Sequence, residues 1–149
     1  MKTTKIWVLA LTASVLLLSA CQEDENLEVA GDLSGAWELT SVSTLEDGQW
    51  TTMSDQDADL GILFFERWED RNQNGKGYRE LANGELAEFE YTVSGADHAY
   101  NVATVNLLMY PTEDPMMNWQ GVYDVVALSS VLTLERENDD IIIKAKRPE

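Results

Sequence analysis

Few residues in this sequence could supply thiol or imidazole chemistry. The chain of 149 residues has one cysteine, Cys21, and one histidine, His98. A disulfide within the chain is therefore excluded, and so is a zinc site built from several Cys and His ligands. His98 falls in a segment that reads as a turn, and we interpret it as solvated. No nucleophile-elbow, phosphate-loop or His-Glu-x-x-His pattern occurs, so we expect a protein that is not an enzyme and that has no cofactor.

Basic residues are also scarce. Lys and Arg together number 10 against 27 Asp and Glu residues, which gives a formal net charge of −17 at pH 7. A surface with this charge repels phosphate groups. We therefore expect no nucleic-acid partner and no electrostatic binding to anionic headgroups, and we interpret the acidity as an aid to solubility.

Long apolar runs are rare, and the one at the amino terminus reads as an export signal. The stretch Ile6–Leu18 follows a positively charged start, is short for a membrane span and precedes small residues. Residues 18–21, Leu-Ser-Ala-Cys, resemble the lipobox of bacterial lipoproteins. The resemblance implies that residues 1–20 are removed as a signal peptide and that Cys21 is lipidated, which would anchor the chain to a membrane. An ordinary signal peptide with a chance cysteine is the alternative.

Acidic residues follow the cysteine directly. Residues 21–32 are polar and lack apolar periodicity, so we expect a disordered tether. Glu23, Asp24 and Glu25 resemble the acidic export signal of Gram-negative surface lipoproteins, which implies a lipid-anchored location in the outer membrane at the cell surface. A solvated spacer explains the same three residues.

Helical periodicity is missing from the rest of the chain, because no segment keeps apolar residues at the helical spacing. Alternating segments separated by turn residues instead predict antiparallel strands. In the first of them we place Trp37, Leu39 and Ser41 on one face and Val42 on the other. The expected strands cover residues 33–42, 50–53, 62–69, 78–82, 87–93, 100–110, 121–128, 131–136 and 141–146. The expected turns are Asp47-Gly48, Asn74-Gly75, Asn83-Gly84 and Asn138-Asp139-Asp140, and Ser94-Gly95 is expected to end the strand 87–93.

Periodicity alone leaves a sandwich and a barrel open. The opening strand, Gly35-Ala36-Trp37, resembles the Gly-x-Trp strand of lipocalins and of lipocalin-like domains in bacterial surface lipoproteins, and weaker similarities extend over residues 33–147. The resemblance implies an all-β, antiparallel up-and-down barrel of eight strands over residues 33–149, with room for a small apolar ligand. The acidic loop Ser54–Asp59 and the Pro-Met-Met loop depart from the family pattern.

One segment looks like half of a calcium loop. Asp70, Asn72 and Asn74 place oxygen ligands at alternate positions before Gly75, but Leu81 stands where a bidentate glutamate is needed. We therefore expect a hairpin turn and no metal site.

Two hypotheses for function follow. A carrier of a small apolar molecule needs a partial cavity that opens near the loop Pro111–Asn118, and an interaction or inhibitor module at the cell surface needs a filled barrel and an apolar rim. The residues expected to line the carrier's site are Trp37, Phe89, Tyr91, Ala103, Val105, Met116 and Met117. Met116, Met117 and Trp119 are the candidates for the rim or for a plug. The sequence leaves the oligomeric state open.

Overall fold

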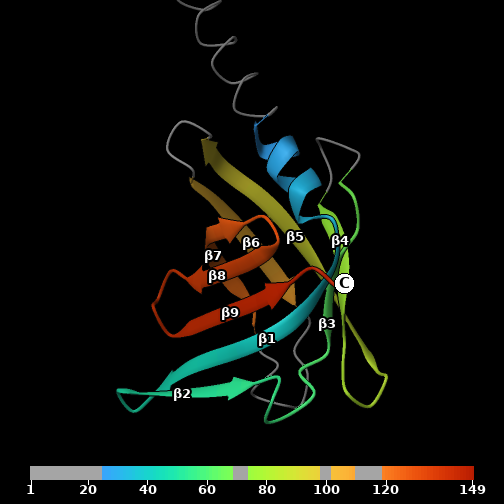
Figure 1. Cartoon of the computed structure of the whole chain (residues 1–149). Coiled ribbons are helices and arrows are strands. Elements are labelled where there is room, and N and C mark those ends of the chain that lie inside the picture. Colours follow the sequence, from blue (N-terminus) through green and yellow to red (C-terminus); the bar gives the residue numbers. More distant parts are fainter. Residues whose placement is uncertain (1–24, 69–73, 98–101, 110–118) are drawn as a thin grey trace, which may run out of the picture.

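The computed structural model describes residues 25–68, 74–97, 102–109 and 119–149. Within these ranges the chain forms one short helix, residues 25–33, and nine antiparallel strands (Figure 1). The strands are β1 (Gly35–Glu46), β2 (Gln49–Ser54), β3 (Ile62–Phe65), β4 (Gly75–Glu80), β5 (Leu86–Asp97), β6 (Val102–Met109), β7 (Gly121–Leu128), β8 (Val131–Arg136) and β9 (Ile141–Lys146).

The strands close into an up-and-down barrel. Each of β3 to β8 pairs with the next strand in the chain, and β1 pairs with both β3 and β9, so that β1 and β3 to β9 form a ring of eight strands. The expected all-β, antiparallel up-and-down barrel of eight strands is therefore confirmed. A closed ring leaves no free edge, which is why this architecture needs no second sheet to cover it.

The short helix corrects the sequence analysis, which expected no helix and a disordered tether up to residue 32. Val29, Ala30 and Leu33 point inward from one side of it and are buried. Asn26 Oδ1 accepts a hydrogen bond from Ala96 N at 3.0 Å, which ties the helix to β5. Three apolar positions are too few for a periodic signal, and contact with the barrel stabilises a helix of this length.

The barrel has two ends that differ. The helix lies at the end where β1 begins and where β5 and β9 finish, and we name this the helix end (Figure 1). The other end, named the hairpin end, carries the β1–β2 turn, the β4–β5 turn and the start of β7. The expected mouth, Pro111–Asn118, lies outside the described residues.

A bulge in β1 changes which residues face the core. The pairing of β1 with β9 shifts register between Leu39 and Ser41. Because one extra residue reverses the alternation, Val42 is 3% exposed and belongs to the core, whereas Ser41 is half-buried. The expectation that Ser41 shares the inward face with Trp37 and Leu39 is wrong for this reason.

The acidic loop that departed from the family pattern is an insertion between β2 and β3. Both strands pair with the same edge of β1, β2 from Ser41 onward and β3 up to Glu38. Residues 55–61 therefore stand opposite only Leu39 and Thr40. Hydrogen bonds from Asp55 N to Thr40 O, 3.0 Å, and from Leu39 N to Gly61 O, 3.1 Å, close the base of this loop.

Two glycines in β4 make room for aromatic rings. A Cβ atom on Gly75 would lie 2.3 Å from the Tyr91 ring, and one on Gly77 would lie 2.4 Å from the Phe89 ring. These glycines pair with Tyr91 and Phe89 across the sheet. Gly75 is thus a strand residue and does not form the turn expected for Asn74-Gly75, whereas the turns at Asp47-Gly48 and Asn83-Gly84 are present.

Candidate functional site: the barrel interior and its two ends

The barrel interior holds most of the residues proposed to line a ligand site. Trp37, Tyr91 and Val105 are 0% exposed, Phe89 is 2% exposed and Ala103 is 8% exposed. A side chain beside an empty space large enough for water retains accessible area, so these values describe a closely packed interior. Met116 and Met117 lie outside the described residues, and ligand binding by the whole set stays a prediction.

Aromatic rings pack against one another inside the barrel. Phe65 from β3 meets Phe89 and Tyr91 from β5 edge to face, with ring centroids 5.4 Å and 5.0 Å apart. These are favourable distances for aromatic pairs. The structure therefore joins Phe89 and Tyr91 through Phe65, a residue that was not expected to belong to the site.

Polar atoms of the interior side chains bond to the protein's own backbone. Trp37 Nε1 donates to Leu33 O at 2.7 Å, and the hydroxyl of Tyr91 donates to Glu66 O at 2.8 Å. The hydroxyl of Tyr123 donates to Trp119 O at 2.7 Å. Because these carbonyl oxygens satisfy the donors, none of the three donors needs a ligand to replace water.

The buried environment changes the pKa of the Tyr91 phenol. Burial, with a smaller contribution from the Glu66 carboxylate, raises the pKa of Tyr91 to about 12. Burial also raises the pKa of Tyr123. Both shifts disfavour the tyrosinate inside the fold.

The pH dependence of stability follows from the sign of this shift. The pKa of Tyr91 in the folded protein, about 12, lies above the ordinary value of 10.0. The buried neutral phenol therefore makes its full contribution to the stability of the fold below pH 10, and this contribution is lost as the pH rises through 12. We expect Tyr91→Phe to flatten this alkaline loss while costing about 1 kcal/mol at neutral pH through the missing hydrogen bond. Urea melts between pH 7 and pH 12 measure both effects. Parallel pH curves for the variant and the wild type would contradict the assignment.

Arg147 closes the helix end. Its guanidinium lies 3.7 Å from the centroid of the Trp37 ring, a cation–π geometry. The same group donates to Asp32 O at 2.6 Å and to Ser34 O at 2.8 Å. Arg147 therefore connects the residue that follows β9 to the end of the helix and to the start of β1, and its guanidinium covers the Trp37 ring.

A second arginine lies inside the hairpin end. Arg79 is 5% exposed, donates to Leu60 O at 2.7 Å and stacks 4.1 Å from the centroid of the Trp119 ring. Arg79 is not among the residues expected inside the barrel. The alternation of β4 carried the signal, because Arg79 shares a face with Gly75 and Gly77. Trp119 is 1% exposed, so it belongs to the core at this end and not to an exposed rim.

An ion pair supports the β8–β9 turn at the same end. Arg136 donates to both carboxylate oxygens of Asp140, at 2.6 Å and 2.5 Å. The hydrogen bond from Arg136 lowers the pKa of Asp140. Both side chains are partly exposed, so this pair fixes the turn more than it stabilises the fold.

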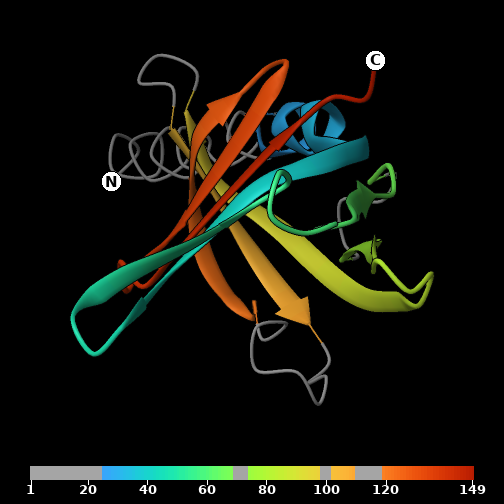
Figure 2. The ribbon, with the colours of Figure 1, turned by 60° about the horizontal axis from the view of Figure 1, so that its bottom comes forward.

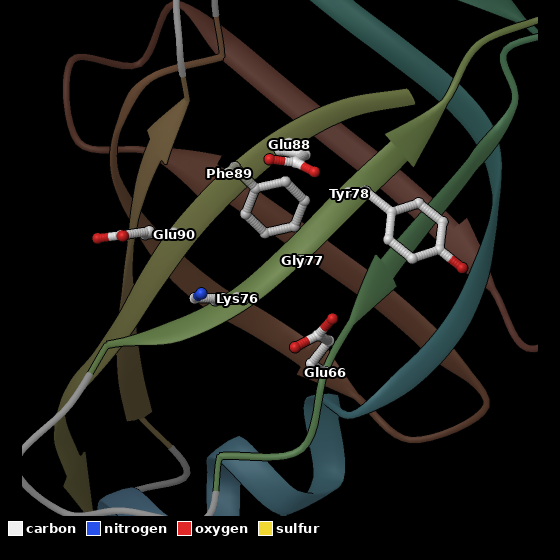
Figure 3. Close-up of a pocket in the computed structure, with 7 residues that line it drawn as sticks. All are labelled: Glu66, Lys76, Gly77, Tyr78, Glu88, Phe89 and Glu90. Atoms are coloured by element: carbon white, nitrogen blue, oxygen red, sulfur yellow. The ribbon is translucent and has the colours of Figure 1, made fainter. Parts of the chain in front are cut away.

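The outer wall of the barrel carries a shallow hollow of about 360 Å³ over β3, β4 and β5 (Figure 3). Lys76 projects from it between Glu66, which follows β3, and Glu90 of β5. Asn74 donates to Glu90 at 2.9 Å, and Tyr78 stacks on Phe64 with 4.9 Å between ring centroids. These groups bond to one another or face solvent, so we interpret the hollow as an uneven part of the surface and not as a ligand site.

The described ranges, 25–68, 74–97, 102–109 and 119–149, contain neither a cluster suited to a metal ion nor a helix suited to span a membrane. Within them, no group of three or more His, Cys, Asp or Glu side chains is placed to hold a metal ion. No helix within the same ranges is both long and apolar enough to span a bilayer. Asp70 and Asn72 of the calcium-like segment lie outside these ranges, and so do His98, Cys21, Glu23 and Asp24.

A solved structure is similar to this chain over most of its length. The crystal structure of a lipocalin-like protein from Bacteroides uniformis aligns with 78% of this chain and 100% of its own, with 24% sequence identity and a TM-score of 0.46. No protein-family model matches the chain, and no curated protein matches it. The closed barrel described above therefore rests on the strand pairing of this chain and not on that likeness.

Proposed function

We propose that this protein is a lipid-anchored lipoprotein of the bacterial cell envelope whose filled barrel acts as a scaffold for binding a partner through its outer surface. One observation carries the second part of the proposal. The residues best placed to line a ligand site are 0–8% exposed, and their neighbours are packed aromatic rings. Opening a site there would cost contacts that native interiors rarely give up.

The anchoring part rests on the sequence around Cys21. Acyl chains contribute about 0.8 kcal/mol for each buried methylene group, and stable attachment takes more than one chain. The helix at residues 25–33 is tied to the barrel, so lipidation at Cys21 would hold the barrel close to the bilayer. Glu23, Asp24 and Glu25 would then act as the signal for display on the cell surface.

The anchor has a direct test. We expect Cys21→Ala to leave the signal peptide uncleaved or to release the protein from the membrane fraction, because the thiol is the site of lipid attachment. Fractionation and intact mass measurement of the purified protein report both. Recovery of a normally processed variant in the membrane fraction would contradict lipidation.

A second candidate function has one observation in its favour. Among the described residues no group accepts a hydrogen bond from Trp119 Nε1, which is buried at the hairpin end. A small ligand with an oxygen atom could satisfy this donor, and the protein would then be a carrier that opens at this end.

Apolar probes separate the two candidates. We expect a fluorescent fatty acid to show no saturable binding to the purified protein and no quenching of tryptophan emission, because the interior is filled. A Leu107→Ala variant titrated with benzene instead of the fatty acid is the control for an opened interior, because Leu107 is 0% exposed and its truncation leaves a cavity that can take benzene. Binding of the fatty acid at one site per chain, abolished by Ala103→Trp in a variant that still folds, would establish the carrier instead.

A further inference from the structure

The strand β2 has a free edge. Among the described strands it pairs only with β1, and it lies outside the ring that closes the barrel. Figure 2 shows the β1–β2 hairpin projecting beyond the other strands, at lower left. Residues 49–52 are all exposed, so no strand or helix in the described part of the chain covers this edge.

The register shows which backbone groups point away from the protein. Glu46 pairs with Gln49 across the two-residue turn, so hydrogen-bonded and non-hydrogen-bonded pairs alternate from there. Leu45 N donates to Asp140 O on the β9 side at 2.8 Å, which places its partner Trp50 at a non-hydrogen-bonded position. By the same alternation, the N–H and C=O groups of Trp50 and Thr52 face outward.

This edge lacks the usual protection against an added strand. Natural edge strands carry charges, prolines or bulges that prevent pairing. The residues of β2 are Gln-Trp-Thr-Thr-Met-Ser, without charge or proline, in a chain of net charge −17, and their pairing with β1 is regular. Trp50 is 47% exposed and adds an apolar contact beside the outward backbone groups.

Both ends of the edge are acidic. Glu46 and Asp47 precede β2, and Asp55, Asp57 and Asp59 follow it, all of them exposed. A second copy paired antiparallel at β2 would bring the acids at the start of one strand against the acids at the end of the other. Like charges at that distance repel, whereas basic residues at both ends of an incoming strand would be attracted.

We propose that β2 binds, as an added antiparallel strand, an extended segment of a partner protein with an uncharged centre and lysine or arginine at both ends. This proposal rests on the proposed function, because it names the outer surface that a filled barrel would use. Backbone hydrogen bonds to Trp50 and Thr52 supply the affinity, and the flanking carboxylates select the partner's charge.

A peptide of alternating threonine and valine with two lysines at each end is a suitable probe. The full chain, purified in detergent, is titrated into the fluorescently labelled peptide while its anisotropy is followed. Thr52→Pro removes one outward N–H without removing a hydrogen bond to β1. It also removes the hydrogen bond between the Ser43 and Thr52 hydroxyls, 2.8 Å. Thr52→Ala is the matched control, because it loses that side-chain bond and keeps the N–H.

We expect the wild type and Thr52→Ala to bind the peptide alike, and Thr52→Pro to bind at least tenfold more weakly. The same peptide with glutamates in place of the lysines should bind at least tenfold more weakly to the wild type. Equal binding by Thr52→Pro, equal binding of the two peptides, or no binding at all would overturn the proposal. So would dimerisation of the wild type that Thr52→Pro abolishes, which would identify a second copy as the occupant. None of these failures alters the result of the fatty-acid test.

Discussion

Replacing Trp37 by alanine is expected to lower the free energy of unfolding by about 3–5 kcal/mol, as for other large aromatic residues removed from a core. The indole is 0% exposed, its N–H bonds to Leu33 O at 2.7 Å, and Arg147 covers its face. Its loss would therefore leave a cavity where the helix, β1 and the end of β9 meet. Urea denaturation followed by circular dichroism measures the change.

Trp50→Ala is the matched control for this experiment. The same side chain is deleted, but Trp50 is 47% exposed on β2 and packs against little. We expect an effect within about 0.5 kcal/mol, the usual range for surface positions. If the two variants melt alike, Trp37 does not hold the helix end together as the structure indicates.

Gly61→Ala is expected to be the most damaging glycine substitution, because two costs add at this position. The φ angle of Gly61 is +83°, a conformation that costs about 1–2 kcal/mol for a residue with a Cβ atom. A Cβ atom would also lie 1.9 Å from Glu80 O, a backbone atom of β4 that cannot move without disturbing the β3–β4 pairing. Forced repacking of this kind costs about 1–3 kcal/mol more.

Gly84→Ala separates the two costs. Gly84 has nearly the same φ, +82°, but nothing lies within 4 Å of the position of its Cβ atom. We expect Gly84→Ala to lose only the conformational part, and the difference between the two variants in urea melts to give the cost of the clash. If the losses are the same, the contact with Glu80 relaxes freely and the insertion of residues 55–61 is not held as described.

Alternation in the sequence predicted the strands and the resemblance to lipocalins predicted the barrel, but neither predicted the details that shape its ends. Period-two alternation and Asx-Gly turns follow from local sterics, so the strands and the turns at Asp47-Gly48 and Asn83-Gly84 could be placed without tertiary information. The helix at residues 25–33 could not, because three buried apolar side chains gain their stability from the barrel. Val42 faces the core and Ser41 does not, the reverse of the prediction, because the position of a bulge depends on the pairing partner.

The features of the candidate site likewise fall into those that the sequence determined and those that only the tertiary structure decided. The sequence by itself determined that the chain is acidic, lacks thiol and imidazole clusters, and alternates as strands, because these are properties of composition and spacing. The tertiary structure decided that Phe65 joins Phe89 and Tyr91, that Arg79 lies inside against Trp119, and that β2 keeps a free edge. Close packing and strand closure depend on residues far apart in the chain, and one strand's pattern carries no information about which neighbour will fill the space beside it.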